Sequence, residues 1–325
     1  MLMQGNVACV EGAIEAGCRF FAGYPITPAS EIMNHMVKRV KEAVFIQMED
    51  EIASISACIG ASWAGVKAMT ATSGPGFSLM QEGIGFAAMT ETPCVVVDVQ
   101  RAGPSTGQAT KVAQGDVIQS RFGSQGDYET IVLAPSSAQE MYDLTVEAFN
   151  LSEKFRTPAI LLADETVGRL SEEVSLKDFE IVNRKRGYTK EPFGGEMVPP
   201  MPAFGDGCEL LITGSTHDAR GYRKTQDSKV QKELLERLKK KVEDHRDEIF
   251  RHEAYNEDSK TILVSFGIEA RACHEACLRL NGKVGFLKLN TIWPFNFEKI
   301  SEILEGKRAV VVELNYGQLS MLIRN

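Results

Sequence analysis

The stretch at 48–76, MEDEIASISACIGASWAGVKAMTATSGPG, contains the features that decide the fold. The apolar segment before it ends in an acidic run that closes with Glu51, as expected where a strand meets a helix. The helix that follows consists mainly of small residues, which allow close approach to another backbone or to a planar ligand. A second short strand then ends in the turn TSGPG at 72–76. Polar residues therefore follow two strands in succession.

Helical periodicity alternates with short β-rich runs on both sides of this stretch, from residue 5 to about residue 170. Such alternation predicts βαβ crossovers, and hence an α/β fold with a mostly parallel sheet that helices cover on both faces. Ligand contacts are expected at the carboxyl ends of the strands. A second, smaller α/β pattern begins at Thr261 and includes the strand AVVVELN at 309–315.

We expect three parts in the chain: a first domain at 1–180, a linker at 181–258 and a second domain at 259–325. The linker begins with a segment rich in Gly, Pro and charge, which predicts a surface connection packed loosely over the first domain. The segment 229–255 has Glu–Lys and Asp–Arg pairs at helical spacing, which predicts one long, solvated helix. Since the last residues leave little room for their helix, we expect the second domain to be truncated.

Charge and apolar content exclude several classes of protein. Acidic residues (44) outnumber basic residues (36), and the formal charge of -8 argues against a nucleic-acid partner. The amino terminus lacks the pattern of a signal peptide. The sequence also contains no run of about 18 consecutive apolar residues, so no membrane-spanning helix is predicted. We therefore expect a cytoplasmic protein.

The seven cysteines lie mostly in apolar segments, where a reduced thiol acts as a small hydrophobic side chain. They form no Cys-x-x-Cys pair, so we expect no iron–sulfur cluster in this chain. Cys273, His274 and Cys277 share helical spacing, but their apolar surroundings favour a packed core over a zinc site. No metal ligand is predicted.

Several motifs in order support a more specific interpretation. They are GYPITPASEI at 23–32, QMEDE at 47–51, FSLMQEG at 77–83 and VDVQRAGPSTG at 97–107. The Glu51 region resembles the pyrimidine-binding domain of thiamine-diphosphate enzymes, and the set of motifs resembles the alpha subunit of 2-oxoacid:ferredoxin oxidoreductases. The resemblance covers most of the chain, and the smaller domain resembles the transketolase C-terminal domain.

The resemblance assigns roles to individual residues. It implies that Glu51 forms a hydrogen bond with N1′ of the cofactor's aminopyrimidine, although Glu49 and Asp50 are rival carboxylates in the same run. Burial of such a carboxyl group would raise its pKa and strengthen that bond. The implied cofactor-binding set is Glu51, Tyr24, Pro25, Ile26, Thr72, Ser73 and Gly74.

The resemblance also implies a substrate site. Thr27 would donate a hydrogen bond near the 2-oxo group, and the planar fork of Arg101 would hold the substrate carboxylate. The stretch PSTGQATK looks most like the 2-oxoglutarate branch of the family. Thr110 and Lys111 lie in it, and Lys111 could pair with the second carboxylate of 2-oxoglutarate, although a solvent-facing lysine is an equal alternative.

The chain lacks the segment that binds the diphosphate in thiamine-diphosphate enzymes. The one Gly-Asp-Gly, at 205–207, lies in the linker, and the next asparagine is Asn256, too far for the family spacing. The resemblance therefore implies a partner beta subunit that holds Mg²⁺, the diphosphate and the iron–sulfur cluster, in an (alpha-beta)2 assembly.

The implied reaction is the oxidative decarboxylation of 2-oxoglutarate to succinyl-CoA and CO2, or its reverse, with coenzyme A and ferredoxin as partners in anaerobic metabolism. Three alternatives remain open at this point. The same machinery could act on pyruvate or a branched-chain 2-oxoacid. The chain could be a non-catalytic scaffold subunit, or a stand-alone carboligase, which would need a diphosphate-binding half.

Overall fold

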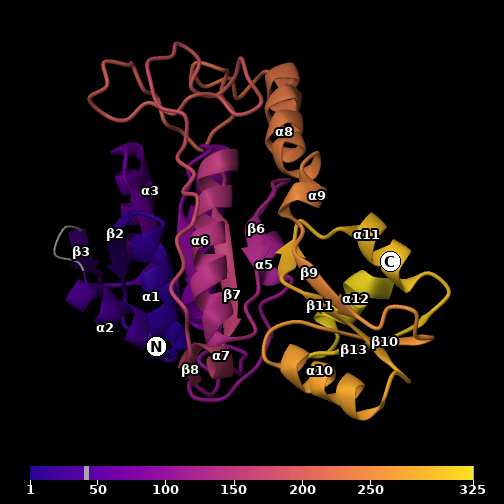
Figure 1. Cartoon of the computed structure of the whole chain (residues 1–325). Coiled ribbons are helices and arrows are strands. Elements are labelled where there is room, and N and C mark those ends of the chain that lie inside the picture. Colours follow the sequence, from indigo (N-terminus) through magenta and orange to yellow (C-terminus); the bar gives the residue numbers. More distant parts are fainter. Residues whose placement is uncertain (40–43, 325) are drawn as a thin grey trace.

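The structure, a computed structural model, describes residues 1–39 and 44–324 and contains a large and a small α/β unit (Figure 1). The large unit is built on a seven-stranded sheet in the order β12-β6-β7-β5-β4-β2-β3, in which only β12 pairs antiparallel. Its strands are β2 (Cys18–Gly23), β3 (Val44–Gln47), β4 (Lys67–Thr72), β5 (Val95–Gln100), β6 (Ile131–Leu133), β7 (Ala159–Asp164) and β12 (Thr291–Trp293). The predicted mostly parallel sheet is confirmed.

Helices cover both faces of the large sheet, as predicted. On one face Val95, Val97 and Val99 pack into the core beneath α1 and α6, and on the other Val96 packs with α3 and α4. The helices of this unit are α1 (Gly5–Glu15), α2 (Ser30–Arg39), α3 (Glu51–Trp63), α4 (Gly74–Met89), α5 (Gln119–Phe122), α6 (Ala138–Phe155) and α7 (Glu165–Arg169). A separate two-stranded antiparallel sheet is formed by β1 (Leu2–Gln4) and β8 (Ser171–Glu173).

The small unit has a four-stranded sheet in the order β13-β10-β11-β9, with β9 antiparallel to β11. Its elements are β9 (His252–Tyr255), β10 (Thr261–Ser265), β11 (Gly285–Leu289), β13 (Arg308–Val312), α10 (Glu269–Arg279), α11 (Phe297–Leu304) and α12 (Gln318–Arg324). Cys273 and Cys277 pack against Phe286 in its core, as predicted. Strand β12 leaves this unit and pairs with β6, so the large sheet is completed by a C-terminal segment.

The prediction of one long helix at 229–255 is wrong. The structure has α8 (Ser228–Glu243), then the short α9 (Arg246–Ile249), and then strand β9. Residues 252–255 alternate between half-buried and exposed, which suits an edge strand paired with β11 better than a helix.

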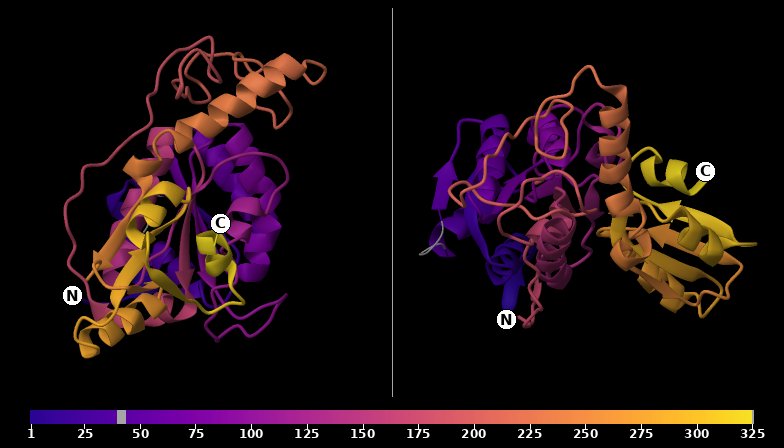
Figure 2. Two further views of the ribbon diagram at one scale, coloured as in Figure 1. Left: turned by 90° about the vertical axis from the view of Figure 1, so that its right-hand side faces the viewer. Right: turned by 90° about the horizontal axis from the view of Figure 1, so that it is seen from above.

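The connection at 174–227 is irregular; it first runs along α6, where the Tyr142 hydroxyl donates to the Lys177 carbonyl at 2.9 Å, and then lies over the amino-terminal ends of the large sheet's strands (Figures 1 and 2). The sequence predicts that this connection packs loosely over the first domain, and that prediction is wrong. Arg184 is buried, donates to Glu153 Oε2 at 2.9 Å and reaches the Ser62 carbonyl at 3.1 Å, while Phe193 and Met201 enter the core. A charged residue can be buried here because its donors are satisfied.

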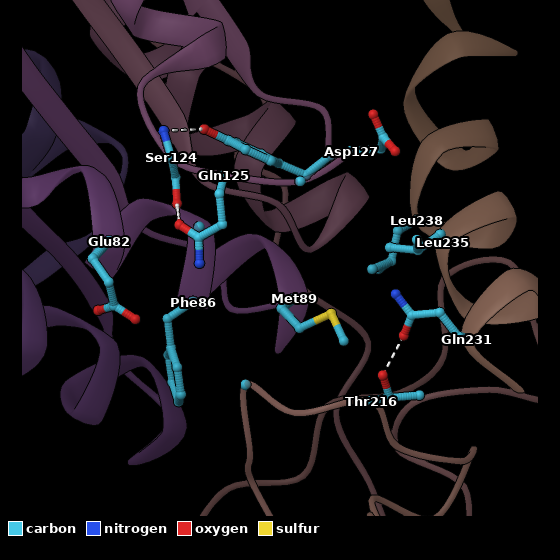
Figure 3. A pocket seen from close by; sticks show the side chains of 14 residues that line it. Glu82, Phe86, Met89, Ser124, Gln125, Asp127, Thr216, Gln231, Leu235 and Leu238 are labelled. Carbon is cyan, nitrogen blue, oxygen red and sulfur yellow. Dashed lines mark hydrogen bonds between the residues drawn. The ribbon is translucent and has the colours of Figure 1, made fainter. Parts of the chain in front are cut away.

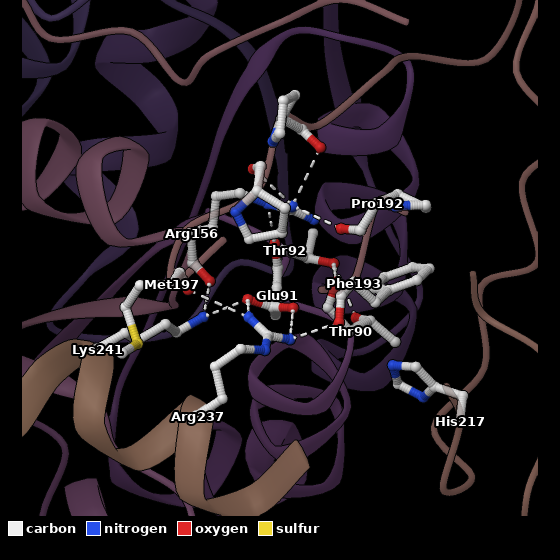
Figure 4. Close-up of polar contacts among 12 residues, drawn as sticks. Thr90, Glu91, Thr92, Arg156, Pro192, Phe193, Met197, His217, Arg237 and Lys241 are labelled. Atoms are coloured by element: carbon white, nitrogen blue, oxygen red, sulfur yellow. Dashed lines mark hydrogen bonds and ion pairs between the residues drawn. The ribbon is translucent and has the colours of Figure 1, made fainter. Parts of the chain in front are cut away.

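Helix α8 also has a buried charged side, so the prediction of a solvated helix holds only for its outer face. Glu91 is fully buried and receives hydrogen bonds from Arg237 at 2.8 Å and from Lys241 at 3.0 Å (Figure 4). Arg237 also donates to the Phe193 carbonyl at 2.8 Å, and Lys241 to the Arg156 carbonyl at 2.9 Å. Burial alone would raise the pKa of Glu91, but the cations around it hold that pKa far below its usual range.

Replacing Glu91 by glutamine should destabilise the chain by about 3–5 kcal/mol, because it leaves buried cations without their anion. The Glu91 pKa is depressed in the folded chain. The contribution of Glu91 to folding stability is therefore present above the pKa of a glutamate in the unfolded chain, about 4.3, and is lost only in strong acid. Thermal unfolding of the assembled protein at neutral pH measures the effect. Glu236→Gln on the exposed side of α8 should change stability by less than about 0.5 kcal/mol; equal losses in both variants would contradict this account.

Candidate active site

The predicted site residues converge on the carboxyl edge of the large sheet. Glu51 is the first residue of α3, Thr72 is the last residue of β4, and Arg101 directly follows β5. Because β2, β4 and β5 run parallel, their carboxyl ends meet at one edge. The loop at 24–29, which follows β2, reaches the same edge, where its Thr27 carbonyl accepts a hydrogen bond from Arg101.

The three carboxylates of the acidic run differ in their surroundings. Asp50 caps α3, accepting a hydrogen bond from the Ala53 amide at 2.7 Å. Glu49 is exposed, whereas Glu51 is only 4% exposed. Glu51 is therefore the member of the run that is both buried and not used as a helix cap.

Thr72 and Gly76 enclose the Glu51 carboxyl group. The Thr72 hydroxyl donates to Glu51 Oε1 at 3.4 Å. A Cβ atom at Gly76 would lie 2.2 Å from Glu51 Oε1 and 2.1 Å from Thr72 Oγ1, so only glycine leaves space for this arrangement. Burial raises the pKa of Glu51, and Asp50 adds to this, while Thr72 and Arg101 lower it.

Arg101 joins the two loops at the edge of the site. Its Nη1 donates to the Thr27 carbonyl at 2.7 Å and its Nη2 to the Thr106 carbonyl at 2.8 Å. The side chain is 9% exposed, and its buried Nε has no partner among the described residues. A guanidinium group has five N–H donors, so Arg101 keeps donors available for an incoming anion.

The other predicted residues lie at different depths. Ser73 is buried, and its hydroxyl has no hydrogen-bond partner in the described part of the chain. Ile26 and Gly74 are half-buried, whereas Tyr24 and Pro25 are exposed. Tyr24 and Pro25 can therefore contact only a molecule that covers the edge of the sheet.

Thr110 and Lys111 also lie on the surface. The backbone of Lys111 closes the loop after β5, since its carbonyl accepts from the Ala102 amide at 2.9 Å and its own amide donates to the Gln108 carbonyl at 3.1 Å. Its side chain is exposed, and its ammonium group forms no hydrogen bond or ion pair with a residue within 1–39 and 44–324. The loop therefore fixes the Lys111 backbone, and the exposed side chain extends from it without an ion pair to a described residue.

Sequence reasoning overlooked two residues at this edge. Asp98 is fully buried on β5, where it is the Cα partner of Thr72. Its signal in the sequence was a single acidic residue inside the apolar run VVVDVQ. Asp116 lies in the loop beyond Arg101, close to the Asp98 carboxyl group. Asp98 lies in the motif at 97–107, but that motif assigns a role only to Arg101, and Asp116 belongs to none of the motifs.

The arrangement suits the pyrimidine end of thiamine diphosphate. A buried carboxyl group with a raised pKa, a glycine beside it and the unpartnered Ser73 hydroxyl fit a flat ring that carries nitrogen atoms. The diphosphate end does not fit this chain in the same way. Asp206 of the Gly-Asp-Gly segment already accepts from the Ala203 amide at 2.9 Å and pairs with Arg186.

Two general features of the described residues bear on the site. In 1–39 and 44–324, no group of three or more His, Cys, Asp or Glu side chains is placed to hold a metal ion. None of the helices in the same ranges is both long and apolar enough to cross a bilayer.

A separate cavity of about 360 Å³ lies between α4, the loop at 124–128 and α8 (Figure 3). Phe86, Met89, Leu235 and Leu238 supply its apolar lining, and it contains none of the predicted site residues. It is therefore distinct from the edge that holds Glu51.

Comparison with known proteins agrees with the motifs. Residues 11–237 match the family model described as pyruvate flavodoxin/ferredoxin oxidoreductase, thiamine diphosphate-binding. The chain is 52% identical over 328 residues to the 2-oxoglutarate synthase subunit KorA of Methanocaldococcus jannaschii, covering 98% of this chain and 89% of the relative. It is 48% identical to the subunit of the same name from Methanothermobacter marburgensis, covering 98% of this chain and 88% of that one.

A solved structure is similar over the whole chain. The 2-oxoglutarate:ferredoxin oxidoreductase from Magnetococcus marinus, with 2-oxoglutarate, coenzyme A and succinyl-CoA bound, superposes with a TM-score of 0.92 at 33% identity. The match covers 100% of this chain and 60% of that one, so the chain spans less than two thirds of that protein. The resemblance inferred from the sequence is confirmed: the chain belongs to the thiamine-diphosphate-binding pyruvate flavodoxin/ferredoxin oxidoreductase family.

Proposed function

We propose that the chain is the alpha subunit of an enzyme that oxidatively decarboxylates 2-oxoglutarate. The overall reaction converts 2-oxoglutarate and coenzyme A into succinyl-CoA and CO2, and its two electrons pass singly to ferredoxin; the reverse direction uses the same groups. The observation that carries the proposal is the buried Glu51 carboxyl group, held between Thr72 and Gly76 at the carboxyl edge of the sheet. The names of the relatives at 52% and 48% identity support 2-oxoglutarate as the substrate.

Thiamine diphosphate, when bound, supplies the nucleophilic carbon and the electron sink that decarboxylation of a 2-oxoacid requires. The Glu51 carboxyl group exchanges a proton with N1′ of the pyrimidine, and its burial suits this exchange because it raises the pKa towards the working pH. The rest of the wall around the pyrimidine ring is formed by residues that follow β2 and by residues from the end of β4 to the start of α4: Tyr24, Pro25, Ile26, Thr72, Ser73 and Gly74.

The substrate site is formed by the two loops that Arg101 joins. The guanidinium group holds the carboxylate next to the 2-oxo carbon, and the Thr27 hydroxyl donates to the 2-oxo oxygen. Because Arg101 already donates to the Thr27 and Thr106 carbonyls, its position is fixed before the substrate arrives. Preorganised donors of this kind lower the cost of binding a charged substrate.

A partner beta subunit completes the enzyme. It holds Mg²⁺, the diphosphate and the iron–sulfur cluster, and it pairs with this chain in an (alpha-beta)2 assembly in the cytoplasm. The Gly-Asp-Gly segment at 205–207 supports this division, since its aspartate is engaged with Ala203 and Arg186 at the opposite end of the unit. Activity is therefore expected from the complex and not from the isolated chain.

The proposal is tested by anaerobic assay of the co-expressed alpha–beta complex. Coenzyme-A-dependent reduction of ferredoxin is measured with 2-oxoglutarate, pyruvate and 2-oxoisovalerate. We expect 2-oxoglutarate to have the highest kcat/KM. A preference for another 2-oxoacid would keep the family and overturn the substrate, and absence of turnover with all three would favour a non-catalytic subunit.

Lys111→Met should raise the KM for 2-oxoglutarate about fivefold and leave the KM for pyruvate unchanged. The reason is that only 2-oxoglutarate has a distal carboxylate, and an exposed ion pair contributes up to about 1 kcal/mol. Steady-state kinetics of the complex with both substrates measure the difference. Equal effects on the two substrates would show that Lys111 does not read the distal carboxylate.

A further inference from the structure

Asp98 is a buried carboxyl group that the proposed function does not use. Strand β5 alternates, so Val97 and Val99 face α1 and α6, while Val96, Asp98 and Gln100 face the side of α3 and α4. Asp98 has no exposed surface, and neither of its oxygen atoms receives a hydrogen bond from a donor among the described residues. Such a group needs an explanation, because a buried polar atom without a partner is costly.

The group that Asp98 faces is another carboxyl. Asp116 lies within hydrogen-bonding reach of Asp98, and its Oδ2 would be 3.5 Å from a Cβ atom at Gly74. The pair therefore lies beside the turn that follows Thr72, which is itself the cross-strand partner of Asp98.

The two carboxyl groups are held together by the backbone around them. The Asp116 amide donates to Gln100 Oε1 at 3.0 Å, which ties its loop to the end of β5. The small unit secures the same loop, because the Gln114 amide donates to the Leu314 carbonyl at 2.9 Å and the Ile118 amide to Gln318 Oε1 at 3.0 Å. These contacts fix the backbone that carries the Asp116 side chain, so two ionised carboxylates could separate only by rotation of their side chains.

The charged groups around the pair are few. The pKa of Asp98 is affected by Asp116 and Arg101, and the pKa of Asp116 is affected by Asp98. Glu51 on α3 and Asp164 on β7 lie at the ends of neighbouring elements, but their carboxyl groups accept hydrogen bonds from other donors. Burial, with the like charge of Asp116, raises the pKa of Asp98 well above its usual range, and burial also raises that of Asp116. A hydrogen bond between two carboxyl groups requires that one of them keep its proton.

We propose that Asp98 and Asp116 share one proton, and that Asp98, kept neutral, is a positioning residue that leaves the Arg101 charge available for the substrate carboxylate. The proposal rests on the proposed function, in which Arg101 binds that carboxylate. Arg101 makes its hydrogen bonds to Thr27 and Thr106 and none to Asp98. An ionised Asp98 would place an anion beside Arg101 and weaken its attraction for a second carboxylate.

The two isosteric variants should have opposite effects. Asp98→Asn keeps a neutral N–H donor towards Asp116, so the KM for 2-oxoglutarate should stay low and flat as pH rises. Asp116→Asn gives Asp98 an amide donor in place of an acid, so Asp98 ionises at neutral pH. The KM should then rise about tenfold, which corresponds to about 1.4 kcal/mol of binding free energy. In the wild-type complex the KM should rise only at alkaline pH, where the shared proton is lost.

The experiment measures kcat and KM for 2-oxoglutarate against pH in the three alpha–beta complexes. A purely structural role for the pair would lower kcat in both variants and leave the pH profiles parallel. Superimposed KM profiles for wild type and Asp98→Asn, or an unchanged KM in Asp116→Asn, would overturn the proposal.

Thermal unfolding of the same complexes provides a readout that does not need turnover. Folding raises the pKa of Asp98, so the folded chain holds the proton more tightly than the unfolded chain does. In the unfolded chain the pKa of an aspartate is about 3.9. Stability should therefore fall as pH rises from that value through the folded pKa. Asp98→Asn lacks this proton, and its midpoint should fall less over the same range.

The two readouts separate this inference from the proposed function. If the wild-type complex turns over none of the 2-oxoacids, the proposed function fails and the role towards Arg101 fails with it, while the unfolding data still decide whether a proton is shared. If the wild type is active and its unfolding midpoint follows the same pH dependence as that of Asp98→Asn, the shared proton is disproved and the proposed function stands.

Discussion

Replacing Glu51 by glutamine is expected to lower the turnover of 2-oxoglutarate by the alpha–beta complex roughly 10²–10⁴-fold, the usual contribution of a positioned acid or base. Glutamine has nearly the same shape, so the contact with Thr72 and the space at Gly76 are preserved. The variant cannot exchange a proton with the cofactor ring. Ferredoxin reduction under anaerobic conditions, at saturating coenzyme A, measures the loss.

Glu49→Gln is the matched control for this prediction. Glu49 is two residues away and carries the same charge, but its side chain is exposed. Its replacement should leave turnover within about twofold of the wild type, because an exposed charge contributes little. A Glu51→Gln complex that turns over as fast as the wild type would show that the cofactor ring lies elsewhere.

The second large effect is expected at Gly76. In Gly76→Ala the new methyl group would lie 2.2 Å from Glu51 Oε1 and 2.1 Å from Thr72 Oγ1, so the carboxyl group must move. A displacement of about 1 Å at a reacting group can cost on the order of 10²-fold in rate. We expect a loss of this size in kcat, measured in the same assay.

Gly60→Ala controls for the general effect of adding a methyl group to this part of the fold. Gly60 lies in α3, and a Cβ atom there meets nothing within 4 Å of it. Alanine also favours a helix over glycine by up to about 1 kcal/mol. Turnover in the Gly60→Ala complex should equal that of the wild type, and a Gly76→Ala complex with the same turnover would refute the proposed contact with Glu51.

The large sheet could be predicted from the sequence because its central strands are short, apolar and regularly spaced between helices. Strand β12 could not, since it has only three residues and pairs with β6 from a distant part of the chain. The prediction of one helix at 229–255 is wrong for a related reason. Its charge pattern continues past Glu243, but the pairing of 252–255 with β11 outweighs local propensity.

The candidate site was predictable where a motif marked it. Glu51, Thr72 and Arg101 lie at one edge of the sheet, as parallel strands require. The roles proposed for Gly76 and Asp98 depend on contacts between residues that are distant in the sequence, and the sequence does not reveal such contacts. Gly76 matters because of its distance from Glu51, and Asp98 because burial places it beside Asp116.

The central claim is that Glu51 activates thiamine diphosphate, and the most direct test is the rate at which the C2 hydrogen of the bound cofactor exchanges with deuterium. The rate is followed by quenching and NMR in the alpha–beta complex without substrate. We expect the wild type to exchange C2 far faster than free thiamine diphosphate, and Glu51→Gln to exchange it at nearly the free rate. An exchange rate in Glu51→Gln equal to that of the wild type would contradict the claim.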